Sequence, residues 1–183
     1  LKRELKIILK QKLFYVAAIF FVIITSFFHF IAGNFFSLDL GSASLSQFFL
    51  SMPYICILVI PTLTMNVWNL KNDTFESFPI STTKKVFVKF FALILLFLLI
   101  LIFTLPVVLF TNSFGDVSFS SVFTGYFVIF LYGCCVISLC LFIFSFFQNK
   151  ALAFFSAAII LAIINSSHFL PLYFDLPSFL ASF

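Results

Sequence analysis

Side chains that could bind a coupling ion or act in catalysis are scarce within the apolar parts of this sequence. The six acidic residues all lie outside the long apolar runs or at their edges; they are Glu4, Asp39, Asp73, Glu76, Asp116 and Asp175. A proton- or sodium-coupled transporter usually needs a carboxylate inside the membrane, because that group binds and releases the ion. The placement of the acids therefore disfavours a secondary transporter.

Nucleotide and metal chemistry are not indicated either. The sequence has no G-x-x-x-x-G-K-[ST] run that could form a phosphate-binding loop, so any ATP hydrolysis would need another chain. The cysteines lie inside apolar runs, where they are expected to act as small apolar side chains rather than form disulfides or a zinc site; they are Cys56, Cys134, Cys135 and Cys140. We therefore expect a chain that is not an enzyme and that binds no metal or cofactor.

The two histidines, His29 and His168, fall near the ends of two apolar runs. They lie at similar expected depth and could meet, but no carboxylate or cysteine is placed to complete a catalytic or metal site with them. We therefore expect two histidines at the membrane interface. A site built on the pair is the alternative.

Small and weakly polar side chains mark one face of the fourth apolar run. On a helix with about 100° per residue they fall within about 80° of one another; they are Thr124, Cys135, Ser138 and Ser145. Such faces let helices approach closely and exchange hydrogen bonds, so we expect helix packing here. A polar lining of a transport path is the alternative.

The composition indicates that lipid, rather than water, is the main solvent of the chain. Of 183 residues, 63% are hydrophobic and 9% are charged, against about 45–50% and about 25% in soluble domains. Five apolar runs are each long enough to cross a bilayer as a helix of about 20 residues; they cover residues 13–31, 48–68, 86–110, 122–147 and 151–170. The sequence therefore predicts an all-α, polytopic transmembrane bundle that forms a single domain over residues 1–183.

The basic residues predict how the bundle is oriented. All ten lie in the first twelve residues, between the second and third runs, at the start of the third, or in the turn before the fifth. The connections on the other side contain Asp39, Asp116 and Asp175 and no basic residue. By the positive-inside rule, the N-terminus is cytoplasmic, and five spans bring the end of the chain to the outer side.

The two ends of the sequence differ from the apolar runs between them. Residues 1–12 place leucine and isoleucine opposite lysine and arginine, which predicts an interfacial amphipathic helix on the cytoplasmic leaflet. An ordinary basic flank that only sets topology is the alternative. Residues 171–183 are too short to cross the membrane and are expected to form an outer re-entrant or interfacial segment, or to begin a sixth span.

The connection between the second and third runs combines charged and turn residues. In order it contains Pro61, Met65, Thr74, Glu76, Pro79, Ile80, Ser81 and Lys89. This order resembles the type-2 ABC exporter permeases, particularly the branch with gliding-motility and copper-maturation permeases. Their pattern there is a proline and a methionine, an acidic-basic stretch, T-x-E, a short apolar link, P-[VI]-S and a lysine that opens the third span.

The resemblance covers essentially the whole chain, although only this connection has a recognisable motif. It departs from the family in two ways. The segment between Met65 and Pro79 is several residues shorter, and Asp73 replaces the usual glycine before the threonine. The family also has six spans, whereas this sequence stops before a sixth. We therefore expect a C-terminally incomplete permease domain: a fragment, a chain whose last span is encoded elsewhere, or a protein that no longer functions.

The resemblance implies a function and partners. The chain would be the permease subunit of an ABC exporter in the cytoplasmic (inner) membrane, paired with a second permease chain as a homodimer or heterodimer. A separate ATPase would hold ATP and Mg²⁺ and would contact Thr74, Glu76, Pro79 and Ser81. Lys84, Lys85 and Lys89 would anchor the third span at the inner leaflet. Membrane lipid is then a partner, and nucleic acid is not.

Two alternatives remain open from the sequence. The connection could be a solvated inner loop whose lysines only set topology. The whole chain could be a membrane scaffold or assembly protein that binds partners through its helices and transports nothing.

Overall fold

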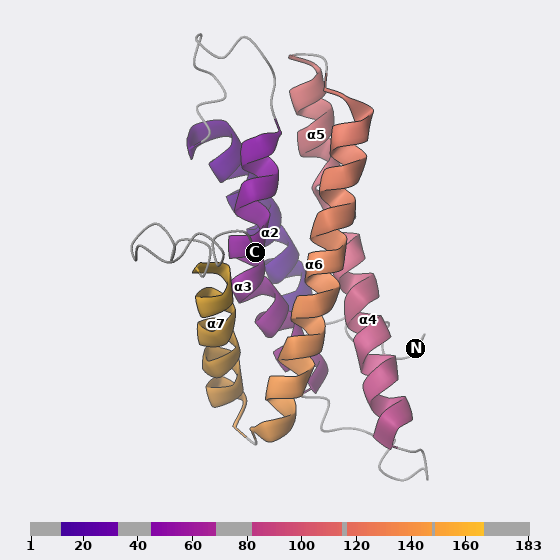
Figure 1. Cartoon of the computed structure of the whole chain (residues 1–183), viewed down its shortest axis with the longest axis vertical. Helices are drawn as coiled ribbons and strands as arrows, with labels where there is room; N and C mark the ends of the chain where they lie inside the picture. Colours follow the sequence, from indigo (N-terminus) through magenta and orange to yellow (C-terminus); the bar gives the residue numbers. More distant parts are fainter. Residues whose placement is uncertain (1–11, 33–44, 69–81, 115–116, 148, 167–183) are drawn as a thin grey trace, which may run out of the picture.

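The computed structural model describes residues 12–32, 45–68, 82–114, 117–147 and 149–166, and all the elements within these ranges are helices. Helix α2 (Lys12–Phe27) continues into a short π-helix, η1 (Phe28–Ala32). Helix α3 (Ser46–Trp68) follows, and then α4 (Thr82–Phe103) and α5 (Leu105–Asn112) run on in nearly the same direction. Helices α6 (Phe119–Phe146) and α7 (Lys150–Ser166) complete the bundle (Figure 1).

Four segments are long and apolar enough to cross a membrane. They are Phe14–Ile31, Ser46–Met65, Val86–Asn112 and Phe119–Phe146, and they coincide with the first four predicted spans. Helix α7 has 17 residues, which at about 1.5 Å per residue gives roughly 25 Å, less than the bilayer core of about 30 Å. Residues 167–170 of the predicted fifth span lie outside the described part of the chain, so a full fifth crossing stays a prediction.

The outer surface of the bundle is apolar. Exposed fractions reach 70% for Leu109, 65% for Phe123 and 81% for Phe119. A soluble protein rarely exposes such a continuous apolar surface, whereas helices that are apolar on all sides are typical of membrane spans. The structure is thus compatible with a multi-pass membrane protein.

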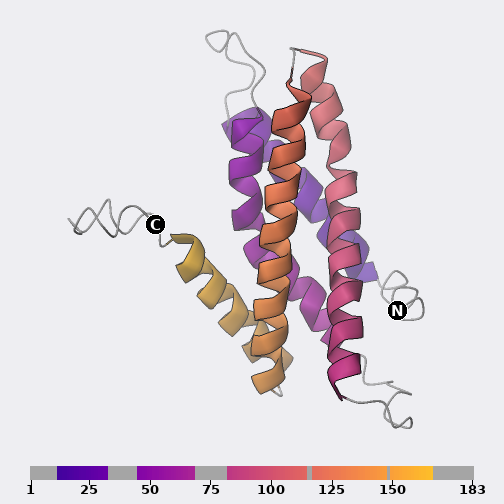
Figure 2. The same ribbon diagram turned by 45° about the vertical axis from the view of Figure 1, so that its right-hand side comes forward.

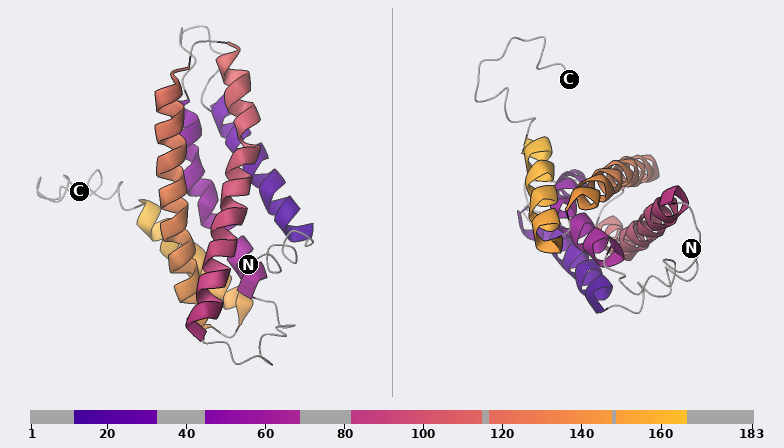
Figure 3. Two further views of the ribbon diagram at one scale, coloured as in Figure 1. Left: turned by 90° about the vertical axis from the view of Figure 1, so that its right-hand side faces the viewer. Right: turned by 90° about the horizontal axis from the view of Figure 1, so that it is seen from below.

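Helix α3 is the centre of the packing, since it contacts α2, α4, α6 and α7. Viewed from below, the other helices surround it (Figure 3). Large side chains that are fully buried fill the space between them; they are Phe14, Phe21, Phe48, Met52, Ile60, Leu63, Leu93, Leu96, Phe97, Ile100 and Phe144. Helix α7 packs against α3 and α6 and inclines away from the lower end of α6 (Figure 2).

The prolines do not all act alike. Helix α3 runs through Pro53 and Pro61 without interruption. The third predicted span is instead divided into α4 and α5 at Thr104, two residues before Pro106. The N–H of Thr104 donates to the carbonyl of Leu101 at 3.0 Å, so the ladder tightens locally to an i→i−3 bond where proline removes a donor.

Several predictions fall on residues outside the described ranges. The interfacial helix over residues 1–12 is described only at Lys12, which begins α2. The outer segment over residues 171–183 and the predicted ATPase contacts, Thr74, Glu76, Pro79 and Ser81, are not described at all.

Candidate functional site

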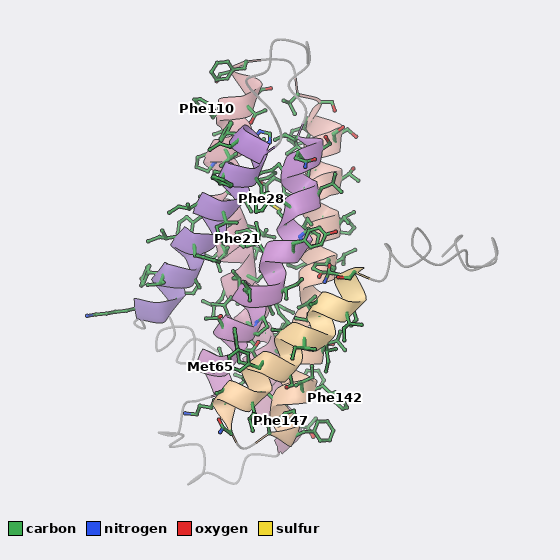
Figure 4. All side chains as sticks on the ribbon, turned by 90° about the vertical axis from the view of Figure 1, so that its left-hand side faces the viewer. Phe21, Phe28, Met65, Phe110, Phe142 and Phe147 are labelled. Carbon is green, nitrogen blue, oxygen red and sulfur yellow. The ribbon has the colours of Figure 1, made fainter. Side chains whose placement is uncertain are left out.

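The helix ends that flank residues 69–81 lie at one end of the bundle. The end of α3 and the start of α4 are found there, together with the end of α6 and the start of α7 (Figures 1 and 4). In Figure 4 this end is marked by Met65 of α3 and by Phe142 and Phe147 near the end of α6. A partner protein that binds residues 69–81 would therefore contact this end of the bundle. We call it the basic end, because α4 and α7 have lysines in their first turns there.

The lysines that were predicted to open the third span are helical. Lys84, Lys85 and Lys89 lie in the first turns of α4, which begins at Thr82, four residues before the apolar span that starts at Val86. Lys84 is exposed and Lys89 is half-buried. With Lys150 at the start of α7, they place positive charge at the basic end.

The opposite end of the bundle differs in charge. Its described residues, 28–32, 45–50 and 110–114, contain no lysine or arginine. The segregation of charge that the sequence indicates is therefore retained between the two ends of the described bundle. Helix α2 is an intermediate case, because it starts above the lower ends of α4 and α6 (Figure 3).

The predicted polar face of α6 is not buried against another helix of the described chain. Thr124, Cys135, Ser138 and Ser145 are all exposed. The structure also divides them, since Ser138 and Ser145 line a groove with α4 near the basic end, whereas Thr124 lines a groove with α3. Within the described residues these four side chains are exposed, so contact of this face with lipid or with another chain stays a prediction.

The first of these grooves, the α4–α6 groove, has a volume of about 580 Å³. Helix α4 contributes one apolar side and α6 the other; the lining residues are Thr83, Val86, Phe87, Phe90, Ser138, Leu141, Phe142 and Ser145. The hydroxyl of Ser145 donates to the carbonyl of Phe142 at 2.6 Å, so its hydrogen bond is made within α6. An apolar chain could therefore lie against both helices.

The second groove, the α3–α6 groove, has a volume of about 460 Å³ and is more polar. Its lining includes Ser46 and Tyr54 of α3, Thr124 and Tyr132 of α6, and Asn165 of α7. The hydroxyl of Tyr132 lies 3.0 Å from Oδ1 and 2.7 Å from Nδ2 of Asn165, which joins α6 to α7.

His29, which is expected at the depth of the membrane interface, lies at the end of the first span with its side chain buried inside the bundle. It lies in η1, is only 1% exposed, and has Nε2 at 3.0 Å from Oγ1 of Thr111 in α5. The Thr111 hydroxyl itself donates to the carbonyl of Val107, so it accepts from the imidazole. The bond ties the first span to the third at the end opposite the basic one. His168, its suggested partner, lies outside the described residues.

A similar bond joins α6 to the break between α4 and α5. Oγ1 of Thr104 lies 2.9 Å from the hydroxyl of Tyr126 and also donates to the carbonyl of Leu101. Sequence reasoning did not single out Thr104, Thr111, Tyr126 or Tyr132. The available signal was a hydroxyl inside a long apolar run, but a linear pattern does not show which helix its partner occupies.

Glycines on α6 allow two aromatic rings to approach its backbone closely. A Cβ added at Gly133 would collide with the ring of Phe97, and one added at Gly125 would lie 2.6 Å from the ring of Phe49. Helix α6 is therefore fitted to α4 through Gly133 and to α3 through Gly125. These contacts position the sides of both grooves.

The described residues offer binding surfaces more readily than reaction chemistry. Within them, no three side chains of the His, Cys, Asp or Glu types gather where they could hold a metal ion. What they present is an apolar bundle with one basic end, from which residues 69–81 lead out of α3 and into α4. Comparison with protein-family models, curated proteins and solved structures finds no match to this chain.

Proposed function

We propose that this chain is the membrane-spanning permease subunit of an ABC transporter of the exporter type. It would move an unidentified substrate across the cytoplasmic membrane, driven by a separate ATPase that binds ATP and Mg²⁺. The observation that supports this most is the ordered motif from Pro61 to Lys89, because it links two membrane helices at the basic end of the bundle. The absence of a Walker-type motif in the sequence agrees with hydrolysis in another chain.

The packing of α3 suggests how force on residues 69–81 would reach the membrane. Helix α3 contacts every other spanning helix, and α4 follows those residues directly. A push by an ATPase on Thr74, Glu76, Pro79 and Ser81 would therefore be passed to the two helices that organise the bundle. Packed helices respond to such a push as rigid bodies rather than by continuous deformation.

The other predicted residues have places in this proposal. Lys84, Lys85 and Lys89 would hold the first turns of α4 at the inner leaflet, whose anionic lipids attract basic side chains. The exposed face of α6, with Thr124, Cys135, Ser138 and Ser145, would be turned to lipid or to the second permease chain. The N-terminus would then be cytoplasmic.

Co-purification tests the proposal. The full chain is purified from its native membrane in a mild detergent, and retained proteins are identified by mass spectrometry. We expect one stoichiometric partner with a G-x-x-x-x-G-K-[ST] motif, and we expect Glu76→Ala and Pro79→Ala each to lower its recovery by about tenfold, which is the effect of losing roughly 1.4 kcal/mol of binding free energy.

The matched control lies on the opposite connection. Asp116→Ala removes a carboxylate there and is expected to leave recovery of the ATPase unchanged. If the intact chain retains no ATPase, or if Asp116→Ala acts as strongly as Glu76→Ala, the permease proposal is wrong and a non-transporting membrane scaffold becomes the better description.

A further inference from the structure

The α4–α6 groove combines an apolar trough with positive charge beside it. Its volume of about 580 Å³ lies within the range of about 300–1,000 Å³ that is usual for small-molecule sites. Val86, Phe87 and Phe90 form one side and Leu141 and Phe142 the other. These side chains suit a flexible hydrocarbon chain.

Two lysines on α4 lie just beyond the edges of the face that lines the groove, and neither is among its lining residues. On a helix with about 100° per residue, Lys84 and Lys89 each lie about 110° from the centre of the α4 face that lines the groove, in opposite directions. Lysine side chains are long enough to lie along apolar surface and bring the ammonium group to the headgroup level. Lys84 is exposed in the first turn of α4, one residue after the groove-lining Thr83.

The α3–α6 groove provides a comparison within the same molecule. Its lining is mostly apolar but includes more hydroxyl, phenol and amide groups, and like the α4–α6 groove it has no lysine or arginine among its lining residues. Of these two grooves, only the α4–α6 groove is formed by a helix whose first turns contain Lys84 and Lys89.

We propose that the α4–α6 groove binds an anionic phospholipid, with one acyl chain between α4 and α6 and the phosphate at the ammonium group of Lys84. The inference does not rest on the proposed transport function, because it uses only the groove and its flanking charge. It gives Ser138 and Ser145 a shared role as small residues that leave space for the acyl chain.

Fluorescence quenching by brominated lipid tests this site. The single tryptophan, Trp68, is replaced by phenylalanine, and Phe87→Trp places a reporter in the groove, where Phe87 is 57% exposed. Vesicles contain dibrominated phosphatidylglycerol or dibrominated phosphatidylcholine. We expect about fivefold tighter binding of the anionic lipid at this reporter, which corresponds to one lysine near an anionic surface.

Three variants distinguish lipid binding in the groove from a general electrostatic attraction of anionic lipid to the protein. Lys84→Gln is expected to abolish the preference, and Lys84→Arg to retain it. Ser138→Leu fills part of the groove while leaving Lys84 in place, and it is expected to lower the preference as well. A preference that persists in Lys84→Gln, or that is unaffected by Ser138→Leu, overturns the proposal.

The control reporter is Phe155→Trp on α7, a side chain that is 62% exposed five residues from the start of its helix. Any preference for anionic lipid seen there should not respond to Lys84→Gln. If both reporters lose their preference equally, Lys84 acts through the overall surface potential and the groove is not a lipid site.

Discussion

Replacing Leu131 with aspartate is expected to make membrane insertion of α6 less favourable by about 3 kcal/mol, the difference between the two side chains at a span centre. Leu131 lies near the middle of α6 and is 49% exposed at the surface of the bundle. In a water-soluble protein, a polar substitution at an exposed position usually changes stability by less than about 0.5 kcal/mol. A membrane-spanning α6 therefore predicts a large effect of Leu131→Asp, whereas a helix exposed to water predicts a small one.

The measurement uses the α6 segment as a reporter in a membrane-insertion assay. Because the native segment is strongly apolar, leucines are first replaced by alanine until about half of the molecules insert, so that the assay responds in both directions. Leu131→Asp should then reduce the inserted to non-inserted ratio by roughly a hundredfold. The control is Phe119→Asp at the first residue of α6, which should have a much smaller effect. Equal effects at the two positions would contradict a span centred near Leu131.

Gly133→Leu is expected to prevent the native packing of α6 against α4. A side chain at this position would collide with the ring of Phe97, which is fully buried. Adding methylenes to a packed core typically costs about 1–3 kcal/mol, and the four-carbon leucine side chain exceeds what a small shift can absorb. We expect Gly133→Ala to lower the free energy of unfolding by about 1–3 kcal/mol and Gly133→Leu to yield little folded protein.

Unfolding by SDS in mixed micelles, together with the monodisperse fraction on gel filtration, measures both effects. Cys135→Leu is the matched control, since it places the same leucine side chain two residues along the same helix at an exposed position. Trimming the ring in the double variant Gly133→Ala, Phe97→Leu should recover part of the lost stability through coupling of the two sites. Full tolerance of Gly133→Leu would mean that α4 and α6 do not meet at this point.

The helical spans could be predicted from sequence because their signals are local. A long apolar run must satisfy its backbone within the segment, so it becomes a helix wherever lipid surrounds it. The third span begins at residue 86 as predicted, while helix α4 begins four residues earlier and includes Thr82, Thr83, Lys84 and Lys85. These residues remain in the helix, since a polar first turn can extend beyond the hydrocarbon without loss of its hydrogen bonds.

The lateral arrangement of the helices could not be predicted in the same way. Three prolines lie in two spans, but only the one at Pro106 coincides with a division of its helix. A helical wheel shows that Ser138 and Thr124 share a face, but it does not show that different neighbours form their two grooves. The hydrogen-bond partner of His29 is likewise not visible in a linear pattern, because Thr111 lies 82 residues away in the sequence.

The charge asymmetry of the bundle is the feature on which the transport proposal depends most. Cysteine labelling from each side of the membrane tests it, in a chain whose four native cysteines are replaced by alanine. Ser113→Cys follows α5 at one end of the bundle and Lys84→Cys lies at the basic end. We predict that a membrane-impermeant maleimide labels Ser113→Cys on intact cells and Lys84→Cys only after the membrane is permeabilised. Labelling of both from the same side would contradict the topology and remove residues 69–81 from the compartment that contains the ATPase.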